Sequence, residues 1–64
     1  MVMYSPDAIK KLRKRLGLTV AQFAERVGVV RQTVYFWEKG HSHPRYKELM
    51  AINELAESAS VKAG

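Results

Sequence analysis

The stretch from Leu18 to Gly40 constrains the fold of this chain more than any other part of the sequence. It contains two short segments, 20–27 and 31–39, whose apolar residues recur at helical spacing. Gly28 follows the first segment directly, and glycine adopts the positive φ of a tight turn without steric cost. We therefore predict two short helices joined by a sharp turn.

The flanking residues predict two further helices, at 6–16 and 45–57. Ser5 is a good N-cap for the first of these, and Gly17 ends it. The tail 58–64 is small and polar, so we expect it to fray.

The capping residues and the apolar residues at helical spacing together predict one small all-α domain over residues 1–64. Thr19 and Gln22 have the spacing of a capping box for the helix at 20–27. The residues expected to face inward are Ile9, Leu12, Leu16, Phe23, Ala24, Val27, Val34, Trp37, Tyr46, Leu49, Ile52, Asn53 and Ala56, with Met50 and Leu55 on the flanks of the last face. No strand pattern, repeat or internal linker is evident.

The composition restricts the function. The net charge is +5, and a small basic domain can favour nucleic acid, an anionic membrane or merely solubility. The basic residues gather in the first helix and in the stretch 18–40, so the positive charge and that stretch coincide. Cysteine is absent, so disulfides and thiolate metal sites are excluded. No apolar run reaches the length of about 18 residues that spans a bilayer, and Met1–Pro6 shows no secretory signal. We therefore expect a cytoplasmic protein.

Two helices joined by a tight turn form a helix-turn-helix, which lays its second helix in the major groove of DNA. With Val34 and Trp37 facing inward, helical geometry points the side chains of the second helix outward at Arg31, Gln32, Tyr35 and Phe36. Arginine can bind guanine O6 and N7, and glutamine can bind adenine N6 and N7. We therefore take Arg31 and Gln32 as candidate base contacts.

Over roughly Ile9 to Leu55 the sequence resembles the lambda-repressor-like, Cro/C1-type (XRE) helix-turn-helix domains. The matching residues are Leu12-Arg13, Gly17-Leu18-Thr19, Phe23-Ala24, Gly28-Val29, Arg31-Gln32-Thr33-Val34 and Trp37-Glu38-Lys39-Gly40. The resemblance implies a bundle of four or five helices that binds operator DNA. It also implies an ion pair between Arg13 and Glu38 that joins the first and third helices.

Two positions depart from the family pattern. Val20 stands where the family usually has a glutamine that touches a DNA phosphate, and Val30 stands where Ser or Thr usually caps the recognition helix. Losing that cap costs about 1 kcal/mol. Either the methyl groups of Val30 meet a thymine methyl group, or the chain has drifted toward weaker binding.

The adjacent aromatic residues of the second helix leave three interpretations open. Tyr35 and Phe36 contact DNA, or they form a patch that binds protein, or Phe36 packs as edge core against the first or last helix. As candidate phosphate contacts we take Thr19, Thr33, Lys39, Ser42 and Arg45. The remaining cations of the first helix, Lys10, Lys11, Lys14 and Arg15, are expected to form a solvated face.

The sequence offers little for catalysis or metal binding. The pair His41 and His43 lies in a loop without Cys or a nearby acid, so we expect no metal site. Paired carboxylates, a nucleophile with a base, and a phosphate-binding glycine loop are all missing, so we expect neither an enzyme nor a cofactor.

We therefore expect sequence-specific binding of double-stranded DNA by a transcriptional repressor or autoregulator, as a weak homodimer or a dimer formed on DNA. The alternative is a protein-interaction module that keeps the same fold, such as an antitoxin-type partner or a coactivator-like bridge. A third interpretation is that the chain is one domain of a longer protein.

Overall fold

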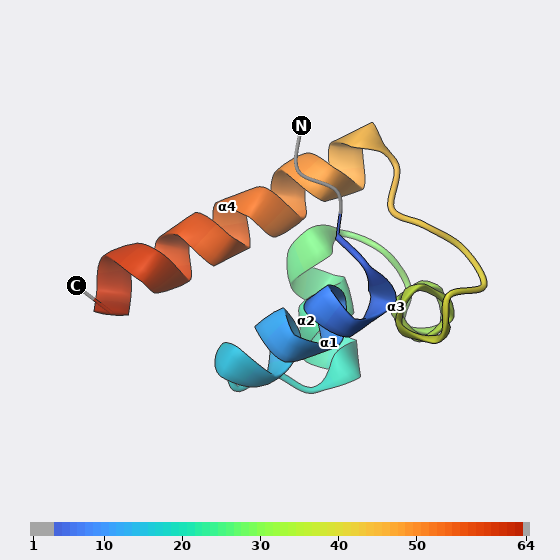
Figure 1. Cartoon of the computed structure of the whole chain (residues 1–64), viewed down its shortest axis with the longest axis horizontal. Coiled ribbons are helices and arrows are strands. Elements are labelled where there is room, and N and C mark those ends of the chain that lie inside the picture. The colour runs from blue at the N-terminus through green and yellow to red at the C-terminus, as the bar shows by residue number, and fades with distance from the viewer. Residues whose placement is uncertain (1–3, 64) are drawn as a thin grey trace.

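Four α-helices make up the described part of the chain (Figure 1). They are α1 (Pro6–Arg15), α2 (Val20–Val27), α3 (Arg31–Lys39) and α4 (Tyr46–Ala63). The computed structural model describes the backbone of residues 4–63 and the side chains of residues 4–58, and this part contains no strand. The predicted all-α class is confirmed, with four helices rather than five among these residues. Met1–Met3 and Gly64, which entered the sequence predictions, lie outside them.

The starts of α1 and α2 follow from their capping residues. The Ser5 hydroxyl oxygen accepts a hydrogen bond from the backbone N–H of Ala8 at 3.1 Å. At α2, the Thr19 hydroxyl oxygen accepts from the N–H of Gln22 at 3.1 Å, and the Gln22 side chain accepts from the N–H of Thr19 at 2.9 Å. Both caps satisfy N–H groups that have no partner inside their helix.

Helices α1 and α4 differ from their expected bounds. Helix α1 ends at Arg15 rather than Leu16, which is its C-cap. Helix α4 begins at Tyr46, where Glu48 accepts from the N–H of Arg45 at 2.6 Å, and it continues to Ala63 instead of ending at Glu57. Residues 58–63 contain neither glycine nor proline, so nothing in them stops a helix. The fraying of 58–64 stays a prediction.

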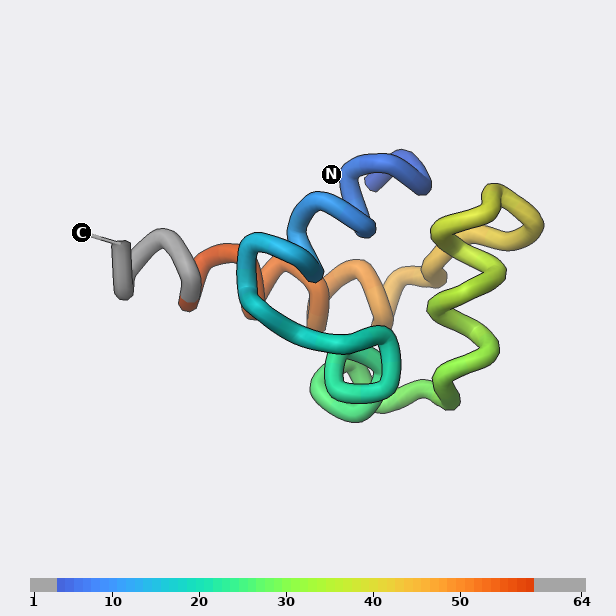
Figure 2. Tube along the Cα trace, turned by 90° about the horizontal axis from the view of Figure 1, so that it is seen from below, coloured from blue at the N-terminus to red at the C-terminus, as the bar shows by residue number. Residues whose placement is uncertain are grey.

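One apolar core joins the four helices. Its buried members are Ile9, Leu12, Phe23, Ala24, Val34, Trp37 and Ile52. Helix α3 packs on both α1 and α2, and α4 lies against α2. Helix α4 starts on the side of α3 and runs away from it (Figures 1 and 2). The surface of α3 that faces away from the core is therefore not covered by α4.

The buried face of α4 matches most of the predicted one. Leu49 and Ile52 are buried, Asn53 is partly buried, and Ala56 is partly buried against the core, where Leu55 on the flank also packs. Tyr46 is exposed, although the sequence placed it on the buried face. A helical side chain covers the turn that precedes its own residue, and before Tyr46 there is only the loop 40–45.

None of the helices in the described residues is long and apolar enough to cross a membrane.

Candidate nucleic-acid interface

The turn between α2 and α3 is fixed by Gly28 and Ala24. Gly28 has a φ of +93°, and a side chain added there would meet nothing within 4 Å, so the turn needs glycine for its backbone angle rather than for space. The N–H groups of Gly28 and Val29 both donate to the carbonyl oxygen of Ala24, at 2.8 and 2.9 Å. Ala24 is buried. These contacts set the direction in which α3 leaves the turn.

Helix α3 has one buried and one exposed face. Val34 and Trp37 lie in the core, as the helical pattern predicted. The exposed side chains of α3 are those of Arg31, Gln32, Tyr35, Phe36 and Lys39, whereas Thr33 is partly buried. The four residues predicted to point outward are thus all on the exposed face, next to a cation at the end of the helix.

The N-terminus of α3 has no side-chain cap. Val30 takes the N-cap position with φ −78° and ψ 154°, and its side chain makes no capping hydrogen bond. That side chain is 69% exposed. The other departure from the family pattern, Val20, behaves differently, because it is partly buried and packs against the core. Val20 therefore has a packing role, whereas Val30 presents apolar surface at the start of α3.

The C-terminal end of α3 carries an aromatic contact. The rings of Phe36 and His41 meet edge to face, with their centroids 6.1 Å apart and their planes at 86°. The N–H of His41 also donates to the carbonyl oxygen of Phe36 at 2.9 Å. Phe36 remains 42% exposed and lies outside the core cluster. It is therefore not part of the buried core.

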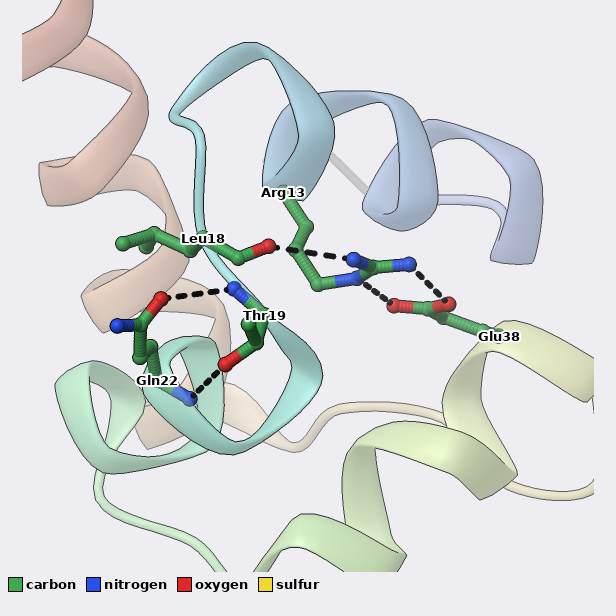
Figure 3. A network of polar contacts seen from close by, with 5 residues as sticks. All are labelled: Arg13, Leu18, Thr19, Gln22 and Glu38. Carbon is green, nitrogen blue, oxygen red and sulfur yellow. Dashed lines mark hydrogen bonds and ion pairs between the residues drawn. The ribbon is translucent and has the colours of Figure 1, made fainter.

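An ion pair joins α1 and α3 (Figure 3). The Arg13 guanidinium donates to both carboxylate oxygens of Glu38, from Nε at 2.8 Å and from Nη2 at 3.2 Å. The Nη1 atom of Arg13 donates to the carbonyl oxygen of Leu18 at 3.2 Å. The two charged side chains are 13% and 10% exposed.

The guanidinium of Arg13 therefore fixes three elements at once: α1, the connection to α2, and α3. The hydrogen bonds to Glu38 raise the pKa of Arg13 above its usual value, so this side chain stays charged at any pH at which a protein is studied.

The candidate phosphate contacts lie at two places. Thr19 is the N-cap of α2 and is exposed, and Thr33 lies in the first turn of α3. Lys39, Ser42 and Arg45 lie at the end of α3 and in the loop that follows, where Ser42 is partly buried and the two cations are exposed.

The remaining cations of α1 are exposed, as the sequence predicted. One of them, Lys11, pairs with Asp7 at 3.2 Å. In the part of the chain that the structure describes, no three His, Asp or Glu side chains gather as a metal site.

Two of the polar contacts that were not predicted from the sequence join different parts of the fold. The Tyr4 hydroxyl donates to Asn53 Oδ1 at 2.7 Å, and Arg13 reaches the backbone of Leu18 in addition to Glu38. The sequence carried a signal for the first of these, because Asn53 is a polar residue on an otherwise apolar helical face and needs a hydrogen-bond partner there.

Comparison with known proteins identifies a family and two relatives. The sequence model of the helix-turn-helix family matches residues 9–58, which is most of the chain. An uncharacterized HTH-type transcriptional regulator of Methanothermobacter thermautotrophicus is 56% identical over 36 residues, which are 56% of this chain and 52% of that protein. Another, of Archaeoglobus fulgidus, is 44% identical over 39 residues, 61% of this chain and 55% of that protein. The chain thus spans about half the length of the curated relatives it matches.

Proposed function

The chain belongs to the Cro/C1-type helix-turn-helix family, and from this membership we propose that it is a transcription regulator of the cytoplasm that binds double-stranded DNA. Its specific role is that of a repressor or autoregulator, which blocks or controls transcription by occupying an operator. Helix α3 lies in the major groove and reads base edges there.

The observation that carries this proposal is the exposed face of α3. Val34 and Trp37 hold α3 on the core, and Arg31 and Gln32 are exposed at its N-terminal end. The N-terminal residues of a recognition helix are those that reach base edges. Arg31 then donates to guanine O6 and N7, and Gln32 pairs with adenine N6 and N7.

The surrounding polar groups suit the DNA backbone. The Thr19 oxygen accepts the capping hydrogen bond, so its hydroxyl hydrogen can be donated to a phosphate oxygen. At the other end of α3, Lys39 and Arg45 place positive charge next to Ser42. Tyr35, between the two ends, contacts a sugar or a base edge, and Phe36 lies beside it.

A mobility-shift titration tests DNA binding by its salt dependence. Operator candidates come from selection of bound sequences out of a random pool of duplexes. Of the phosphate candidates only Lys39 and Arg45 carry a charge that displaces counterions. If both engage, log K should fall by about 1.8 for each tenfold rise in salt, since each neutralised phosphate contributes about 0.9.

Two lysines give a matched comparison for this titration. Lys39→Ala should lower the salt slope by about 1 because it removes one phosphate contact. Lys47→Ala removes the same charge from an exposed position on α4 and should leave the slope unchanged. A shallow slope with no preferred sequence would refute the proposal.

One helix-turn-helix reads few base pairs, so we propose that two copies act together. The contact is a weak homodimer, or a dimer formed on DNA, through α4, where Met50 is exposed and Leu55 partly so. The half-sites then lie one helical turn apart, roughly 34 Å. Sedimentation of the complex with a palindromic site should give two chains for each duplex, and one chain at saturation would contradict the dimer.

A protein-interaction module is the second candidate function. The exposed side chains of Val30, Tyr35 and Phe36 favour it, because solvent-exposed apolar groups on one helix suit a protein partner. The same titration separates the two functions, since a module of this kind shows no steep, salt-sensitive binding to DNA.

A further inference from the structure

The side chain of Val30, the N-cap of α3, has no role in base recognition by hydrogen bonds. Five large apolar side chains are exposed in the described residues, and three of them, Val30, Tyr35 and Phe36, belong to α3 or its N-cap. Val30 is the most exposed of the five, at 69%. A serine or threonine at this place would cap the helix, so the valine gives up a stabilising hydrogen bond and exposes two methyl groups to water.

The position of Val30 places those methyl groups beside the base readers. It directly precedes Arg31 and Gln32 at the N-terminal end of α3, the end that meets base edges in the proposed complex. A valine side chain neither donates nor accepts a hydrogen bond. Facing the amino group of adenine or cytosine, it would therefore leave a polar group without water or partner.

The major-groove edges of the bases carry one methyl group. It is the methyl group on C5 of thymine, at a place where cytosine has only a hydrogen atom. A methyl group on C5 of cytosine occupies the same place on the pyrimidine ring. A valine at a base edge can thus make its most extensive apolar contact with a 5-methylpyrimidine.

The two aromatic residues of α3 suit this role less well. Tyr35 ends in a hydroxyl group, and the Phe36 ring is already in edge contact with His41. Both also lie further along α3, toward the end that we assign to phosphate contacts.

We propose that Val30 is a specificity-determining residue that reads the C5-methyl group of one pyrimidine in each half-site. This inference rests on the proposed binding of α3 in the major groove. It adds that the chain responds to cytosine methylation when a CG pair stands at that position. At that position, 5-methylcytosine is bound more tightly than cytosine, just as thymine is bound more tightly than uracil.

Base analogues that differ by this one methyl group test the inference. In the selected operator, each thymine of a half-site is replaced in turn by deoxyuridine, which keeps all hydrogen-bonding groups. At one position the affinity of the unmodified protein should fall about fourfold, which corresponds to about 0.8 kcal/mol for one methyl group. At the same position, 5-methylcytosine should bind about fourfold more tightly than cytosine, by the same methyl-group estimate.

The matched variant is Val30→Ser, which restores the capping hydroxyl and so keeps the domain folded. It should bind thymine and uracil operators equally, and should likewise not distinguish 5-methylcytosine from cytosine. Tyr46→Ser removes an exposed apolar side chain from α4 and should keep both fourfold ratios.

Three outcomes overturn the inference. If the unmodified protein binds every thymine and uracil pair of operators equally, no methyl group is read, although DNA binding itself stands. If Val30→Ser keeps the fourfold ratio, the effect comes from another side chain or from DNA shape. If no operator can be selected at all, the proposed function fails and this inference fails with it.

Discussion

The coupling between Arg13 and Glu38 can be measured by a double-mutant cycle. Arg13→Met keeps the apolar stem of the side chain but removes its three hydrogen bonds, and it leaves the Glu38 carboxylate almost buried without a partner. Breaking a buried pair costs 3–5 kcal/mol, and the residual exposure of both groups puts this pair at the lower end, about 3 kcal/mol.

The other two corners of the cycle follow from the same contacts. Glu38→Leu should cost about 2 kcal/mol, because Arg13 keeps its bond to Leu18 and its long chain can turn its charge toward water. The double variant should also cost about 2 kcal/mol, since apolar replacement of both partners is often near neutral and only the contact with Leu18 is lost. The single effects sum to about 5 kcal/mol, so the coupling free energy is about 3 kcal/mol.

Urea denaturation at low temperature, followed by fluorescence, gives the four free energies of unfolding. Trp37 is the single tryptophan and is buried, so its emission reports the loss of the core. A core of this size rarely supplies more than about 3–5 kcal/mol, so the same stabilising osmolyte is added to all four proteins.

The exposed pair of Asp7 and Lys11 provides the control cycle. Its members are 74% and 79% exposed, and pairs of this kind couple by about 0.2–0.5 kcal/mol. Additive free energies for Arg13→Met and Glu38→Leu would show that the two side chains do not act as a pair, and the account of how α3 is held would be wrong.

The remaining predictions concern the core, the base contacts, the cap and the dimer. Trp37→Ala should cost about 3–5 kcal/mol, enough to unfold the domain, and a cooperative melt close to that of the unchanged protein would count against the packing. Arg31→Ala and Gln32→Ala should each lose roughly 1–3 kcal/mol on the best site and relax preference at one base position, whereas uniform weakening would make them phosphate contacts. Val30→Ser should stabilise the domain by about 1 kcal/mol in urea denaturation, and no gain would mean that its hydroxyl does not cap α3. Met50→Glu should weaken the dimer in sedimentation without changing helix content by circular dichroism; unchanged association would place the contact elsewhere.

Local signals predicted the first three helices well. The cap at Thr19 and the turn glycines Gly28 and Gly40 depend on backbone angles and hydrogen bonds within four residues, which the sequence displays directly. The last helix lacked such signals at its end. Its extension to Ala63 and the exposure of Tyr46 depend on how α4 packs on the rest of the domain, and periodicity alone does not determine that packing.

In the candidate site, the sequence predicted which residues of α3 are exposed but not the contact that Phe36 makes. The burial of Val34 and Trp37 determines which residues of α3 are exposed, so helical spacing was sufficient for Arg31 and Gln32. The edge contact of Phe36 with His41 depends on the path of the loop after Gly40 and on side-chain rotamers. Neither of these produces a periodic pattern in the sequence.

The hydrogen bond from Tyr4 to Asn53 makes the segment before α1 part of the attachment of α4. It joins residues 49 positions apart, and such distant contacts form late in folding because closing the intervening chain costs entropy. Helix α4 is thus expected to dock after the α2–α3 hairpin has formed. An affinity tag or truncation that displaces Tyr4 would accordingly loosen α4, which lies at the opposite end of the sequence. This loosening would come before any disturbance of α1, the helix that directly follows Tyr4.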